Sequence, residues 1–180
     1  MRTKIFNEEV LYPAEQIVKV DRQDIALLKE QASHNPRQRI RLCAHRDVDD
    51  TLHEMLIIHA KNTYVRPHKH LGKSESFHVI EGGVDVVILD ETGNVAEVIQ
   101  MGDYSSGREF YYRISDPLYH TLLIRSEVLV FHETTHGPFK RSDMAFAPWA
   151  PEENDLSARE EFINKLETMV ESFVSSPEDS

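Results

Sequence analysis

Residues 66–82 read RPHKHLGKSESFHVIEG, which places two histidines one residue apart and a glutamate five positions after the second histidine. Side chains of a β-strand alternate between faces, so His68 and His70 project to the same side with Cα atoms about 6.6 Å apart. Two imidazoles at this separation can bind one ion at about 2.1 Å from each nitrogen. Glu75 follows a short turn and can face the same space from the next strand. The stretch therefore predicts a metal site built on two strands and their turn.

A fourth candidate ligand lies in SDPLYHTLLI, residues 115–124. His120 opens a predicted strand whose next same-face residues, Leu122 and Ile124, are apolar and would line a barrel interior. A histidine among such residues needs a polar partner, and a metal ion shared with other ligands supplies one. We therefore predict one metal ion bound by His68, His70, Glu75 and His120.

From about Thr51 the sequence consists of short runs rich in Val, Ile, Tyr and Phe, separated by turn residues. This spacing is typical of sandwiches and barrels, and no helix is predicted between the runs. A Gly-containing loop at residues 90–94 indicates an antiparallel hairpin. Strands in this number hide their edges by closing into a barrel or a double-sheet jelly roll, so we predict an all-β fold. The predicted strands cover residues 53–60, 63–70, 75–82, 84–90, 95–101, 109–114, 119–125 and 127–134.

Other segments flank the predicted barrel. Before it, an amphipathic helix has Asp21 as its N-cap and stops at Asn35–Pro36. After it, the prolines around Trp149 favour an extended strap, and a capping box at Ser157 and Glu160 begins an amphipathic helix. The apolar face of this helix packs either on the barrel or on a partner subunit. The predicted segments are 1–50 (N-terminal helix and lead-in, packing on the barrel), 51–136 (barrel), 137–153 (Pro/Trp strap) and 154–180 (C-terminal helix and polar tail).

Composition bounds the class of protein. A length of 180 residues predicts one domain with its own core. The lone Cys43 excludes an intramolecular disulfide, and no segment suits a secretory signal, so we expect a reducing cytoplasm. No run approaches the roughly eighteen apolar residues of a membrane helix. The formal charge of −11 argues against a nucleic-acid partner, and residues 151–180 concentrate that charge, with nine acids against two bases.

Several of these residues stand at the spacing of a known motif. His68, His70, Glu75 and Gly82 match the first cupin motif. In that motif, HxH is followed after four residues by Glu and after six more by Gly. A degenerate second cupin motif is resembled by Gly102, Pro117 and His120.

The chain more closely resembles the WbuC-type cupin metalloproteins of bacterial polysaccharide gene clusters. The resemblance spans roughly residues 21–153 and is carried by NPRQRIRLCAH, TYVRPHKH, FHETTHGPF and FAPWAP. It implies a cupin double-stranded β-helix, or jelly roll, that holds a divalent metal on three histidines and a glutamate. It implies no established reaction and does not extend to the C-terminal helix.

The predicted ligand set suits Fe, Mn, Ni, Co or Zn and does not choose among them. Tyr64 and Arg66 share strand parity with the two histidines that follow them, so both are expected to line the barrel interior as candidate substrate-binding residues. Arg66 could bind a substrate carboxylate or phosphate, or form an internal salt bridge to Glu133 or Glu81. Glu133 is a further candidate at the mouth of the site. The remaining histidines are expected to face solvent or to be hydrogen-bonded.

Three functions fit these observations. The leading hypothesis is a small-molecule enzyme acting on a carbohydrate or nucleotide-sugar linked to polysaccharide biosynthesis, in which the metal polarises an oxygen during isomerisation or epimerisation. The alternatives are an iron-dependent dioxygenase and a non-catalytic ligand-binding or sensing module with a structural metal. The expected partners are a small molecule such as a sugar and a second copy in a homodimer, with neither nucleic acid nor membrane.

Overall fold

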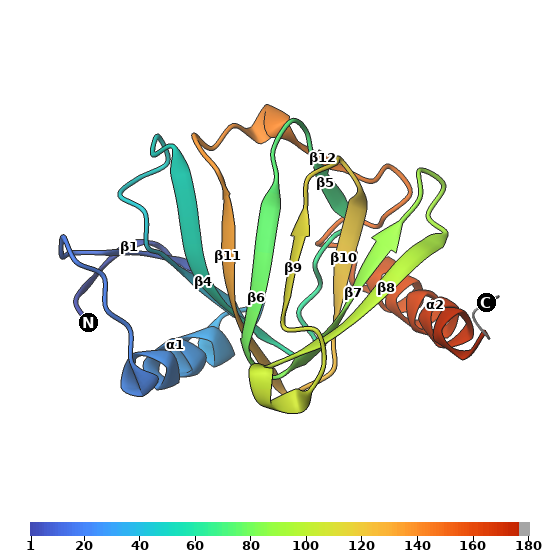
Figure 1. Ribbon diagram of the computed structural model, residues 1–180, viewed down its shortest axis with the longest axis horizontal. Coiled ribbons are helices and arrows are strands. Elements are labelled where there is room, and N and C mark those ends of the chain that lie inside the picture. Colours follow the sequence, from blue (N-terminus) through green and yellow to red (C-terminus); the bar gives the residue numbers. More distant parts are fainter. Residues whose placement is uncertain (177–180) are drawn as a thin grey trace.

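The protein, described here over residues 1–176 of a computed structural model, consists of two facing β-sheets with one helix on the outer side of each (Figure 1). The helices are α1 (Arg22–His34) and α2 (Leu156–Ser175), with two short 3₁₀ helices at Tyr104–Ser106 and Arg141–Asp143. The strands are β1 (Thr3–Asn7), β2 (Val10–Pro13), β3 (Arg39–Cys43), β4 (Leu52–Ala60), β5 (His68–His70), β6 (Glu75–Glu81), β7 (Gly83–Leu89), β8 (Val95–Gly102), β9 (Tyr111–Ile114), β10 (Tyr119–Ile124), β11 (Val128–His136) and β12 (Met144–Phe146). The predicted polar tail reaches residues 177–180, which lie outside the described residues. None of the described helices is long and apolar enough to cross a membrane.

The two sheets form a closed sandwich. One has the strand order β1-β2-β3-β4-β11-β6-β9 and the other β12-β5-β10-β7-β8. Among these twelve strands of the described residues, only β2 and β3 pair in parallel. The main core lies between them, with Phe77 and Phe131 from the larger sheet against Val84, Val86 and Leu122 from the smaller. This arrangement is a double-sheet jelly roll, so the predicted all-β jelly roll with an N-terminal and a C-terminal helix is confirmed.

The strand predictions fail at the edges of the sheets. Four strands were not predicted, namely β1, β2, β3 and β12, and β3 extends the larger sheet by pairing with β4. The predicted strand 63–70 is wrong in its first half, because only His68–His70 pairs, as β5. Pro67 has no N–H to donate to a ladder and restricts the conformation of Arg66, so the preceding residues connect strands without joining either sheet.

α1 begins and ends where the sequence predicts. The Asp21 side chain accepts from the backbone of the first turn and forms a capping box with Asp24, and the helix ends before Asn35. Its buried residues, Leu28 and Ala32, pack on the outer face of the larger sheet. A helix of this length gains most of its stability from such packing rather than from intrinsic propensity.

α2 begins earlier than predicted. Its N-cap is Asp155, whose carboxylate accepts a hydrogen bond from the Ala158 backbone at 3.1 Å. The predicted capping box at Ser157 and Glu160 is therefore wrong. Aspartate caps a helix about as well as serine, and its charge also interacts favourably with the helix dipole, so the earlier residue takes this position.

α2 packs on its own barrel. Leu166 and Val170 are buried against Val87, Leu89 and Leu123 on the outer face of the five-stranded sheet. Of the two alternatives that the amphipathic pattern left open, packing on the barrel is the one observed.

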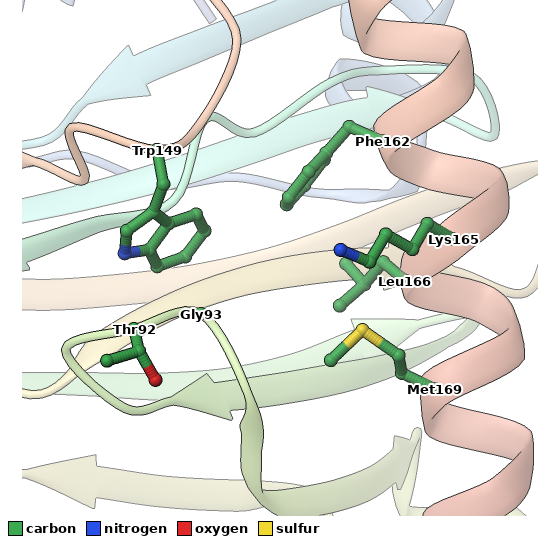
Figure 2. A pocket seen from close by; sticks show the side chains of 7 residues that line it. All are labelled: Thr92, Gly93, Trp149, Phe162, Lys165, Leu166 and Met169. Atoms are coloured by element: carbon green, nitrogen blue, oxygen red, sulfur yellow. The ribbon is translucent and has the colours of Figure 1, made fainter.

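Trp149 anchors the strap between α2 and the loop that joins β7 to β8. Its indole Nε1 donates to the Glu91 carbonyl at 3.1 Å, and its ring lies 6.1 Å from that of Phe162. Figure 2 shows the indole and Gly93 on one side of a small cavity and α2 on the other. That cavity of about 100 Å³ is well below the few hundred Å³ of a typical small-molecule site. The indole therefore serves to hold the strap.

His59 departs from the expectation for the remaining histidines. It lies on the inner face of β4, is only 8% exposed, and its Nδ1 has no hydrogen-bond partner among the described residues. Its ring meets that of Phe131 edge-on at 5.3 Å. Burial, followed by the charges of Arg39 and Arg41, lowers the pKa of His59 to about 3.

Acid is therefore expected to destabilise the native protein through His59. In the unfolded chain the imidazole has a pKa of about 6.5, so below that pH only the unfolded state takes up the proton. The resulting stability is complete above pH 6.5 and is lost as pH falls toward 3, at about 1.4 kcal/mol per pH unit. Urea unfolding in chelator at pH 7.5 and pH 5.5 should show about 1.4 kcal/mol more loss for the natural protein than for His59→Leu. Equal losses in the two proteins would show that His59 is not buried in a neutral state.

Candidate metal centre

Four side chains from three strands converge between the sheets. His68 and His70 lie on β5, Glu75 opens β6, and His120 lies on β10 directly opposite His68. One potential ligand atom of each lies within 4.8 Å of the others. Because β6 belongs to the larger sheet and β5 and β10 to the smaller, closure of the sandwich assembles the cluster. The structure thus brings together all four residues predicted as metal ligands, and the cluster could hold a metal ion.

Backbone carbonyls orient two of the imidazoles. Nδ1 of His68 lies 2.9 Å from the carbonyl oxygen of Arg66, and Nδ1 of His120 lies 3.0 Å from that of Leu118. A carbonyl only accepts, so in each ring Nδ1 carries the proton and Nε2 keeps its lone pair for a metal ion. Burial lowers the pKa of His68 to about 3, so this ring is neutral at pH 7, as metal ligation requires.

The Glu75 carboxylate is held from two sides. The Tyr112 hydroxyl donates to its Oε1 at 2.9 Å, while its Oε2 lies 2.8 Å from Nε2 of His70 and 3.7 Å from Nε2 of His120. Burial alone would raise the pKa of Glu75, but the close contact with His70 and the neighbouring imidazoles lower it to about 2. The carboxylate is therefore ionised and directs one oxygen at the cluster.

His70 shows that a cation fits this cluster. Its Nε2 is buried and forms no well-aligned hydrogen bond with any described residue, although Oε2 of Glu75 lies 2.8 Å away. A buried polar atom without a partner is costly, and a cation between this nitrogen and this oxygen would satisfy both. The donor set of three imidazoles and one carboxylate suits Fe, Mn, Ni, Co or Zn.

Loss of the Tyr112 hydroxyl is expected to weaken metal binding. Tyr112→Phe retains the ring, which stacks 5.3 Å from Phe77, and removes only the group that holds Oε1 of Glu75. The affinity should fall roughly 10- to 100-fold, the usual effect of losing a group that orients a ligand. Competition with a chelating dye at pH 7.5 measures this change. Tyr111→Phe is the matched control because Tyr111 is on the same strand but 52% exposed, and equal affinities for all three proteins would contradict the role of Tyr112.

A second carboxyl group lies near the cluster on the inner face of the larger sheet. Glu133 on β11 pairs in register with Met55 and Phe77, which belong to the main core. Because Thr135 pairs with Glu75, Glu133 and Glu75 are diagonal neighbours across two strands. Burial and then the negative charge of Glu75 raise the pKa of Glu133 to about 8, so it is mostly protonated at neutral pH.

Tyr64 and Arg66 do not line the barrel as strand parity predicted, because the residues that carry them are outside both sheets. The Tyr64 hydroxyl donates to the Pro151 carbonyl at 3.0 Å. Arg66 forms an ion pair with Glu152 at 2.7 Å rather than with Glu133 or Glu81, and also contacts the backbone of the strap. Both side chains thus fasten the strap to the barrel, and their assignment to substrate binding remains a prediction.

Sequence reasoning missed Tyr112. Alternation within EFYYRI places Tyr112 and Ile114 on one face of a strand. This shared face was the only sequence feature that could have pointed to Tyr112. Only the pairing of β9 with β6, which sets Ile114 opposite Glu75, shows that this face is the one turned toward the ligands.

A family model described as a domain of unknown function (DUF6016) matches residues 20–101. The search of curated proteins found no match. Among solved structures, protein SO0799 from Shewanella oneidensis is 8% identical, with a TM-score of 0.46 over 57% of this chain and 66% of that chain. The capsular polysaccharide assembling protein CapF from Staphylococcus aureus is 18% identical, with a TM-score of 0.44 over 54% of this chain and 27% of that chain. The Cnp3 cupin domain of Schizosaccharomyces pombe is 11% identical, with a TM-score of 0.43 over 55% of this chain and 64% of that chain.

Proposed function

We propose that this protein is a metal-dependent enzyme that transfers a proton on a small molecule, with Glu133 as the proton-transfer residue. The observation that carries the proposal is an inward-facing carboxyl group, diagonal to a candidate metal ligand, that has no hydrogen-bond partner within residues 1–176. Its pKa of about 8 reflects burial and the charge of Glu75. Structural carboxyl groups in such places are normally paired or hydrogen-bonded. An unpaired one beside a cluster of ligands is typical of a functional site.

A divalent ion bound to the four ligands would act as a Lewis acid on a substrate oxygen. Glu133 can remove a proton from the carbon next to a carbonyl group and return it to the former carbonyl carbon. A proton that passes from the adjacent hydroxyl to the former carbonyl oxygen completes the isomerisation of a sugar. Return of the proton to the opposite side of the same carbon epimerises it. No oxidant is needed for either reaction. A carboxyl group with a pKa near the working pH is suited to both the acidic and the basic half of this transfer.

Burial is the first cause of the raised pKa of Glu133, so part of the shift would persist when a cation offsets the charge of Glu75. The carbohydrate or nucleotide-sugar class of substrate rests on the resemblance to the WbuC-type proteins. This resemblance determines that sugar phosphates and nucleotide sugars are the first compounds to test.

The test is solvent exchange. Protein loaded separately with Fe(II), Mn, Ni, Co or Zn is incubated in D₂O with a panel of sugar phosphates and nucleotide sugars, and NMR measures deuterium entering the substrate. Exchange is expected with at least one metal, and Glu133→Gln should reduce its rate roughly 100-fold or more without changing the metal content. Glu127→Gln is the control because Glu127 precedes the same strand and its side chain is 86% exposed.

The absence of exchange with every metal and compound would overturn the proposal. Oxygen uptake by the anaerobically loaded Fe(II) protein would favour the dioxygenase alternative instead. Binding of a panel compound with neither exchange nor oxygen uptake would favour a non-catalytic binding module.

A further inference from the structure

We propose that Arg41 binds an anionic group of the substrate, which makes the substrate a small molecule carrying a phosphate or a carboxylate. The inference rests on the proposed function, because it assigns the class of ligand that enters the same barrel. Arg66, for which anion binding is also predicted, already pairs its guanidinium with Glu152.

Arg41 lies on the inner face of the larger sheet. It is on β3 directly opposite Ile57 of β4, and Ile57 pairs with Phe131 of β11. Residues directly opposite one another in antiparallel strands share a face, and both Ile57 and Phe131 belong to the main core. Arg41 itself is exposed, and its strand β3 lies between β2 and β4 in the larger sheet. Its side chain therefore starts from the inner face of this sheet and is accessible to solvent.

The Arg41 side chain has no ion-pair partner within residues 1–176. Arg39, two residues earlier on the same face, is paired instead with Glu9 and Glu153, each at 3.0 Å. The positive charge of Arg41 acts to lower the pKa of Glu133, although no ion pair joins the two side chains within residues 1–176. An arginine fork suits the two oxygens of a carboxylate or phosphate, and here the fork is available to a ligand.

Charge also favours an anion at this place. Three neutral imidazoles and the Glu75 carboxylate carry one negative charge, so a divalent ion would bring the cluster to +1. Arg41 adds a second positive charge on the same inner surface. The protein as a whole has a formal net charge of −11, so its surface repels anions. The inside of the barrel differs from that surface because it would carry positive charge.

The spacing suits a molecule that reaches from Arg41 to the ligand cluster. The path from Arg41 on β3 through β4 and β11 to β6 crosses three strand spacings. Glu75 lies four residues along β6 from the position in register with Arg41. At standard strand spacings this is roughly 20 Å between Cα atoms. A molecule the size of a sugar phosphate or sugar acid, together with the long arginine side chain and the ligand side chains, would span this separation. The anionic group would thus bind at one end and a hydroxyl or carbonyl oxygen at the other.

Isothermal titration of the zinc-loaded protein with inorganic phosphate and with malonate tests the inference. Arg41→Gln should weaken binding of at least one probe roughly 10- to 100-fold, the effect of losing a charge-assisted hydrogen-bonded pair, with zinc content unchanged. Dependence on phosphate alone would indicate a phosphorylated substrate, and dependence on malonate alone a carboxylate. Arg46→Gln makes the same charge change at an exposed loop position and should bind like the natural protein.

Arg41→Lys guards against a glutamine variant that does not fold. Lysine keeps the charge but lacks the two-pronged donor, so binding should still weaken. If the natural protein binds neither probe, or if Arg41→Gln and Arg41→Lys bind as well as it does, the inference is overturned. Deuterium exchange that is equal in the natural protein and Arg41→Gln would reject the role of Arg41 and leave the proposed function standing. Anion binding that depends on Arg41, without any deuterium exchange, would support the role of Arg41 and reject the proposed function.

Discussion

Replacement of His70 by alanine is expected to abolish metal binding. His70 contributes a buried Nε2 that has no other well-aligned partner and lies 2.8 Å from the carboxylate of Glu75. Its loss removes a direct ligand, so the effect should exceed the roughly 10- to 100-fold cost of losing a group that only orients a ligand. Elemental analysis after loading and dialysis should give close to one metal ion per chain for the natural protein and a background level for the variant.

His78→Ala is the control for this experiment. His78 is only eight residues further along, but it pairs with Tyr111 on the outer face of the larger sheet and is exposed, as strand parity predicted. This variant should keep its full metal content. Stoichiometric metal in His70→Ala, or an equal loss in both variants, would contradict the assignment of the ligands.

Replacement of Phe131 by alanine is expected to have the largest effect on stability. Phe131 is 2% exposed, stacks 4.2 Å from Phe77, and meets His59 edge-on. Deleting a buried phenylalanine costs about 3–5 kcal/mol, because the transfer free energy is lost and the cavity closes only in part. That is a large share of the roughly 5–15 kcal/mol by which a domain is stable. The urea midpoint should fall strongly while the slope of the transition stays the same.

Phe139→Ala makes the same substitution on the surface. Phe139 is 57% exposed, and the free energy of unfolding should change by no more than about 0.5 kcal/mol. A small effect of Phe131→Ala would mean that the two sheets do not pack through this aromatic stack.

The barrel could be predicted because each of its longer strands shows its own alternation of inward-facing and outward-facing residues. Alternation in ESFHVIEG places Glu75 and Phe77 inside and His78 outside, and the structure has the same arrangement. The N-terminal strands carried a weaker signal. RIRLC alternates arginine with apolar residues, and its polar face becomes meaningful only when β3 is seen to extend the larger sheet.

The grouping of the ligands was predictable because three of the four lie within one strand-turn-strand unit. Parity failed for Arg66 because the predicted strand 63–70 does not continue through Pro67, and only His68–His70 forms a strand. Tyr112 and Arg41 could not be assigned, since their places depend on which strands pair and in which register. Such long-range pairings are set by the closure of the whole sandwich and leave little trace in the local sequence.

Three imidazoles and one carboxylate are expected to bind a single divalent ion inside the barrel. Diffraction data collected at the absorption edge of the metal, from crystals of the loaded protein, can locate this ion. We expect one anomalous peak at about 2.0–2.2 Å from Nε2 of His68, His70 and His120 and from Oε2 of Glu75. A peak elsewhere in the molecule, or no peak from stoichiometrically loaded protein, would contradict this expectation.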